Sequence, residues 1–206
     1  MLRMNATVEL WDWRRRVADL YAAVRANPDP HAAWRQWSEV RSLLFRTHPQ
    51  SPIESAERTG YPGPEVFPYD PRFRFEVTLR PAAGKKLDLP AGEDGGVTLE
   101  PFALTEGLRS SLGGELTLYW IGGYGGGVFL PFADATSGGE TYGAGRYLLD
   151  TIKSADLGET PDGSLILDFN FSYAPSCAHS PRYVCPLAPR ENRLSAGISA
   201  GERCRV

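Results

Sequence analysis

The sequence has few cysteines, no long apolar run and no apolar leader, and each absence excludes a class of protein. No hydrophobic stretch approaches the ~20 residues that a bilayer-spanning helix requires, so we expect no membrane partner. The N-terminal stretch MLRMNATVELWDWRRR lacks the apolar core of a signal peptide, which favours a cytoplasmic protein. Three cysteines in a reducing compartment do not suggest a disulfide framework.

Clusters of basic residues are missing from the middle of the chain. The net charge is −3, but residues 81–180 hold 5 basic and 13 acidic side chains, a local charge of −8. A duplex-binding surface needs clustered lysine and arginine to replace counterions. We therefore expect no nucleic-acid partner.

Two helical patterns occupy the N-terminal part of the chain. Apolar residues recur every three or four positions, which places them on one stripe of each helix. The first helix should run roughly from Thr7 to Ala26, because Pro28 cannot continue it, and Asp29 can cap the second. We interpret the pair as a hairpin that covers the protein's own sheet, with a partner surface as the alternative. The stripes are Leu10, Trp13, Val17, Leu20 and Val24, then Ala33, Trp37, Val40 and Leu44.

The apolar period changes from 3.6 to 2 at Arg72, and short strands follow without helical patterns between them. This spacing predicts an α+β, mostly β protein: an antiparallel β-barrel or sandwich of about seven strands with an N-terminal helical hairpin. Residues 1–52 would form the hairpin, packed on an antiparallel β domain of residues 53–206. The expected strands are Arg72–Arg80, Val97–Leu104, Glu115–Ile121, Val128–Phe132, Arg146–Leu149, Ser164–Phe169 and Leu194–Ile198.

A Pro-rich loop near the C-terminus holds Cys177, His179 and Cys185. The two cysteines are spaced C-x₇-C, whereas structural zinc sites usually pair cysteines at C-x₂₋₄-C, so we predict no metal site. The remaining interpretations are a buried pair of thiols or a redox-sensitive pair. Cys177 could also act as a nucleophile if a base lowered its pKa.

Polar residues precede this loop on the last clear strand. Asp168 and Asn170 are two positions apart, so they share a strand face with Ile166 and could line a pocket. Earlier, Tyr142 and Arg146 lie in one glycine-rich turn, and arginine suits bidentate binding of a carboxylate or phosphate. The alternative is a structural pair between Asp168 and Arg146.

Five segments carry a family resemblance: HPQSPI at 48–53, FPYDPRFRFEV at 67–77, LPFADATSGGETYGAGRYL at 130–148, LDFNFSYAPSCAHSPRYVCPLAPRENRL at 167–194 and AGE at 200–202. They resemble the prokaryotic domain-of-unknown-function family sixteen eighty-four. The resemblance implies a shared β-rich domain and a shared site built from the third and fourth segments, and it implies no activity. His179 stands where that family more often has an aromatic residue, which weakens the interpretation of this loop as a metal site.

We therefore expect a small-molecule site, for an anionic ligand held by Arg146, on the β domain. Whether a reaction follows is left open; Asp168 or His48 would be its base and Cys177 its nucleophile. The alternative is a structural or redox-responsive protein with a Cys-based or zinc site. The sequence assigns no cofactor and no oligomeric state. The expected ligand-binding residues are Tyr142, Arg146, Asp168, Asn170, Cys177 and His48.

Overall fold

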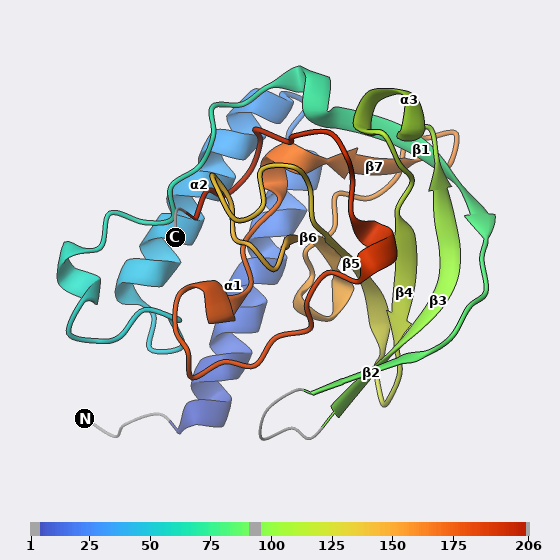
Figure 1. The fold of residues 1–206 in the computed structure, drawn as a ribbon. Helices are drawn as coiled ribbons and strands as arrows, with labels where there is room; N and C mark the ends of the chain where they lie inside the picture. Colours follow the sequence, from blue (N-terminus) through green and yellow to red (C-terminus); the bar gives the residue numbers. More distant parts are fainter. Residues whose placement is uncertain (1–4, 91–95, 205–206) are drawn as a thin grey trace.

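A computed structural model describes residues 5–90 and 96–204. Two long helices are followed by seven strands and one short helix (Figure 1). The helices are α1 (Ala6–Ala26), α2 (Pro30–Thr47) and α3 (Arg109–Leu112). The strands are β1 (Arg74–Pro81), β2 (Leu87–Pro90), β3 (Gly96–Glu106), β4 (Thr117–Ile121), β5 (Gly127–Phe132), β6 (Arg146–Asp150) and β7 (Leu165–Asp168).

The strands form one antiparallel sheet in the order β6-β5-β4-β3-β1-β7, with β2 paired to β3. Its two ends approach each other, because Tyr173, just beyond β7, forms an antiparallel bridge with Tyr147 of β6. The result is a nearly closed, barrel-like sheet, which confirms the predicted fold class. One predicted strand is wrong: Leu194–Ile198 runs as an irregular segment, and the seventh strand is instead Leu87–Pro90.

Local signals explain where the two long helices begin. The Asn5 side chain accepts a hydrogen bond from the Val8 amide at 2.9 Å, and Asp29 accepts from the amides of His31 and Ala32, with Pro30 at the first position of α2. The buried parts of the helices meet at Trp37, whose indole nitrogen donates to the Tyr21 hydroxyl at 3.2 Å. Among the residues that the structure describes, no helix combines the length and apolarity needed to cross a bilayer.

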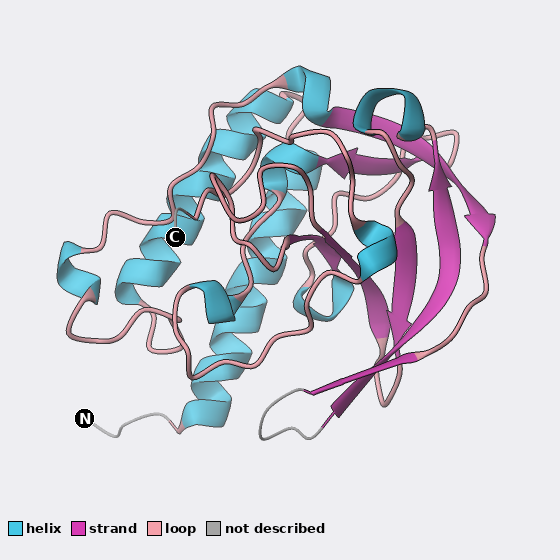
Figure 2. Ribbon diagram, viewed as in Figure 1, coloured by secondary structure: helices cyan, strands magenta, loops and turns pink. Residues whose placement is uncertain are grey.

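Two hydrophobic clusters lie on opposite faces of the sheet. One face carries Leu118 and Leu130 and packs against α3 and the C-terminal segment. The other face, with Tyr119 and Phe129, packs against both helices, which lie together on one side of the sheet (Figure 2). Helices and sheet therefore share a core, while the division of the chain at residue 52 stays a prediction.

One buried and one partly buried ion pair fix the C-terminal segment to this core. Arg146, 1% exposed, binds Asp134 Oδ2 through Nη2 at 3.0 Å, and its Nη1 and Nη2 also donate to the carbonyls of Ala200, Glu202 and Ile198. Glu202 in turn accepts from Arg41 of α2 at 2.6 Å and from the Ala174 amide at 2.8 Å. The segment 198–202 is therefore held between the sheet and the helical hairpin.

Replacing Arg146 with Met should lower the free energy of unfolding by about 3–5 kcal/mol, because Asp134 would remain buried without its cation. Urea unfolding of the two proteins measures this difference. The matched control is Arg72→Met, since Arg72 also pairs with an aspartate but its side chain is 84% exposed. The control should leave the unfolding free energy nearly unchanged. Equal, small effects in both variants would contradict a supporting role for Arg146.

Candidate functional site

Asp168 ends β7 and is buried, at 1% exposed, on the sheet face that meets the helical hairpin. Its Oδ1 accepts two hydrogen bonds from Asn170, from the backbone amide at 3.0 Å and from the side-chain Nδ2 at 2.7 Å. Its Oδ2 has only one long contact among the described residues, from the Tyr69 hydroxyl at 3.4 Å. One oxygen of a buried carboxyl group is therefore nearly free to bond something else.

Burial raises the pKa of Asp168 above its ordinary value, although the Asn170 bonds and the charge of Arg74 oppose that shift. Burial also raises the pKa of the neighbouring Tyr69 to about 12, so the phenol keeps its proton and remains a donor at neutral pH. Raised carboxyl pKa values cluster at binding and catalytic sites, which makes Asp168 a candidate.

A small cavity of about 80 Å³ opens beside this carboxyl group, between the turn of the helical hairpin and the sheet. Two arginines line it. Arg74 lies directly opposite Asp168 in the β1–β7 register, and Arg25 comes from the last turn of α1. Each guanidinium makes one hydrogen bond among the described residues, Arg74 to Glu76 and Arg25 to a backbone carbonyl. Since a guanidinium has five N–H donors, both can bind more.

The rest of the cavity wall is mostly apolar. Val24 and Ala33 come from the helices, and Ile166 lies beside Asp168 on the same strand face, as the two-residue period requires. A cavity of this size holds a few water molecules or one organic molecule of comparable volume. The site can thus combine charge recognition by arginine with a carboxyl group inside an apolar surround.

Asn170 lies just past the strand, because β7 ends at Asp168 and a short 3-10 turn follows. The side chain of Asn170 accepts from the Asp70 amide and donates to the Asp70 carbonyl, both at 2.9 Å. The same side chain donates to Asp168. Asn170 therefore holds the segment that carries Tyr69 and orients the carboxyl group.

Arg146 lies in the interior cluster, where its guanidinium contacts Phe132 and binds Asp134. The alternative pairing of Asp168 with Arg146 is not formed. Burial lowers the pKa of Arg146, despite the opposing charge of Asp134. The two Nη atoms of Arg146 donate four hydrogen bonds to other parts of the protein. Of its three nitrogens, only Nε has no partner among the described residues.

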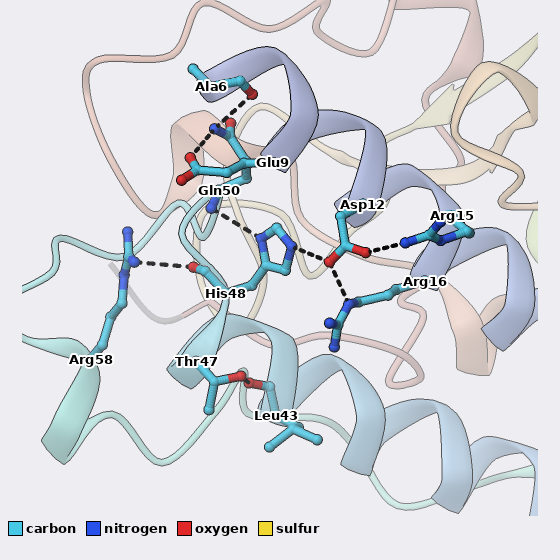
Figure 3. Close-up of polar contacts among 10 residues, drawn as sticks. All are labelled: Ala6, Glu9, Asp12, Arg15, Arg16, Leu43, Thr47, His48, Gln50 and Arg58. Carbon is cyan, nitrogen blue, oxygen red and sulfur yellow. Dashed lines mark hydrogen bonds and ion pairs between the residues drawn. The ribbon is translucent and has the colours of Figure 1, made fainter. Parts of the chain in front are cut away.

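His48 lies at the C-terminal end of α2 and joins the two helices (Figure 3). Its Nδ1 accepts from the Gln50 amide at 3.1 Å, so Nε2 carries the proton and donates to Asp12 of α1 at 3.2 Å. Asp12 also binds Arg15 and Arg16, and these contacts lower the pKa of Asp12 to about 2. These contacts give His48 a place in the hairpin, away from the residues that line the cavity.

Tyr142, in the turn before β6, contacts Cys177 in the loop that follows β7. The Tyr142 hydroxyl donates to Cys177 Sγ at 3.7 Å, and the Cys177 amide donates to Cys185 Sγ at 3.3 Å. His179 lies edge-on against Phe45, and burial lowers its pKa. In the part of the chain that the structure describes, no three His, Cys, Asp or Glu side chains are grouped as a metal ion would require.

The six predicted site residues therefore fall into separate places. Hydrogen bonds join Asp168 to Asn170 and Tyr142 to Cys177, but among the described residues none joins one pair to the other, or either pair to Arg146 or His48. Sequence reasoning missed Arg74, Arg25 and Tyr69. The position of Arg74 could have been inferred from the sequence, because it alternates with core residues along β1. It lies opposite Asp168 once β1 pairs with β7.

Comparison with known proteins gives a family and a structural neighbour. The family model described as "Protein of unknown function (DUF1684)" matches residues 59–203. The solution NMR structure of an uncharacterised protein of Haloarcula marismortui is similar, with 30% sequence identity, a TM-score of 0.54, and coverage of 81% of this chain and 89% of that one. No curated protein matches the chain.

The raised pKa of Asp168 predicts a specific pH dependence for Asp168→Asn. Ionisation is harder in the folded protein than in the unfolded chain, so the wild type loses stability as pH rises from 3.8 through the raised value. The variant does not titrate there, and its Oδ1 can still accept from Asn170. Its stability relative to wild type should therefore increase with pH and then level off, as urea unfolding between pH 3 and pH 8 would show.

Asp162→Asn is the control of opposite sign. Hydrogen bonds from Thr160 and the local backbone lower the pKa of Asp162, so that variant should lose stability relative to wild type as pH rises. A flat difference for Asp168→Asn, or one that follows the control, would show that the carboxyl group is not destabilised in the fold.

Proposed function

The chain belongs to the DUF1684 family of proteins of unknown function, and from this premise we propose that it binds a small anionic molecule in the cavity beside Asp168. The observation that carries the proposal is the unequal bonding of this buried carboxyl group: Oδ1 accepts two hydrogen bonds from Asn170, while within the described parts of the chain Oδ2 has only the long contact from Tyr69. A buried, weakly bonded oxygen is costly unless a ligand uses it.

The charges around the cavity indicate the class of ligand. Arg74 and Arg25 line the cavity with Asp168, and although Arg74 also pairs with Glu76, each guanidinium has further N–H donors, so an anionic group is favoured. The free oxygen of Asp168 accepts hydrogen bonds, which favours a ligand that also carries a hydroxyl or ammonium donor. A small hydroxy acid or amino acid has both features, and its few heavy atoms suit a cavity of about 80 Å³.

This ligand site differs from the predicted one in its anion-binding residue. Arg74 and Arg25 take the role that the sequence assigned to Arg146, while Asp168 keeps its place and Asn170 orients it. We also propose that the protein acts in the cytoplasm of a prokaryotic cell and has no nucleic-acid or membrane partner. The acidic middle of the chain supports the lack of a nucleic-acid partner.

Glycolate should bind the wild type saturably, and Arg74→Met should weaken that binding about 10- to 100-fold, because a hydrogen-bonded charge contact is lost. Glycine and inorganic phosphate extend the test to an ammonium donor and to another anion. Isothermal titration calorimetry gives the affinities, and amide chemical shifts near the cavity give the location. Asp168→Asn should remove the preference for glycolate over acetate, which lacks the hydroxyl group.

Arg80→Met is the matched control for the arginine. Arg80 lies on the same strand as Arg74 but pairs with Glu106 on the surface, outside the cavity, so its loss should leave the affinities unchanged. If no probe titrates saturably, or if both arginine variants weaken binding equally, the cavity is not the binding site.

A further inference from the structure

All three cysteines of the chain lie around one short 3-10 turn, Ser176–Ala178. Cys177 is within the turn, its amide donates to Cys185 Sγ at 3.3 Å, and Cys204 Sγ donates to the Ala178 carbonyl at 3.8 Å. All three are free thiols of intermediate exposure. The site shares no residue with the cavity beside Asp168 and is argued independently of it.

The hydrogen bond to Cys185 brings two sulfurs near each other. The Sγ of a cysteine is three bonds from its own backbone nitrogen, so it lies within about 4 Å of that atom. The sulfurs of Cys177 and Cys185 are therefore within roughly 7 Å, and rotation about the Cα–Cβ bond of Cys177 can shorten that distance. From Ser180 to Pro189 the described backbone forms no helix or strand, and Pro186, next to Cys185, is held by a hydrogen bond from the Tyr147 hydroxyl at 2.6 Å.

We propose that Cys177 and Cys185 are an oxidation site that forms a reversible intramolecular disulfide when the protein meets a peroxide. The Cys177 sulfur attacks one peroxide oxygen and the O–O bond breaks, which gives a sulfenic acid and one water molecule. The Cys185 sulfur then displaces the hydroxyl group as a second water molecule. Two thiols lose two protons and two electrons, and one hydrogen peroxide becomes two water molecules.

The surroundings assign the order of attack. Burial, together with the contact to the Cys177 side chain, raises the pKa of the Cys185 thiol to about 11, and burial also raises the pKa of Cys204. Both are therefore poor first nucleophiles at neutral pH, because the thiolate is the reactive form. Burial raises the pKa of Tyr142 to about 12, so its hydroxyl keeps a proton to donate to Cys177 Sγ. Cys177 reacts first and Cys185 resolves.

The test treats the reduced, folded chain with a few equivalents of hydrogen peroxide, blocks the remaining thiols and digests with trypsin. Free thiols should fall from three to one, with the intact mass lower by two hydrogen atoms. Trypsin cuts after Arg182, between the two cysteines, so the disulfide should join peptides 154–182 and 183–190. Dithiothreitol should restore three thiols.

Cys204→Ser is the control variant, and it should still form the same linked peptides while its free thiols fall from two to none. Three outcomes would overturn the proposal: three free thiols after oxidation, a linkage that includes Cys204, or disulfides between molecules only. A sulfinic or sulfonic acid on Cys177 without the linked peptides would overturn it as well, because it would show that Cys185 does not resolve.

Discussion

The structure depends on satisfying one buried charge. Arg146 brings a guanidinium into the interior cluster, where removing it from water is costly unless partners are already in place. Asp134 neutralises it, and carbonyls of the segment 198–202 accept three further hydrogen bonds from its Nη atoms. The segment forms no strand ladder among the described residues, only an isolated antiparallel bridge between Glu202 and Val66. The C-terminal residues therefore cross the core as an irregular chain whose carbonyls face the guanidinium.

The same constraint reaches the helical hairpin through Glu202. Its backbone carbonyl binds Arg146, and its side chain binds Arg41 of α2 and the Ala174 amide. Arg41 lies over the rings of Trp37, Phe45 and Tyr173, so its charge is held inside an aromatic surround. Sheet, C-terminal segment and hairpin are thus joined by one continuous polar network. Its charged groups are paired with one another, and of the Arg146 nitrogens only Nε lacks a partner among the described residues, so the network has little capacity left to bind a ligand.

The parts of this fold that depend on local chemistry could be predicted from the sequence. The Asp29-Pro30 start of α2 and the alternation along β1 are decided by neighbouring residues, and both were placed within a few positions. The carbonyl partners of Arg146 could not be predicted, because they depend on the path of the C-terminal segment. Leu194–Ile198 has the apolar content of a strand, yet Leu194 and Ile198 fill the interior cluster instead.

The candidate site was harder to predict because it is made by docking. Asp168 and Ile166 could be placed on one strand face from their spacing, but a strand face becomes a cavity only when something covers it. Here the cover is the hairpin turn, which brings Arg25 against a sheet that already carries Arg74. The hairpin therefore does more than shield apolar surface. It supplies one wall and one charge of the cavity, so the proposed ligand site exists only when the hairpin is packed on the sheet.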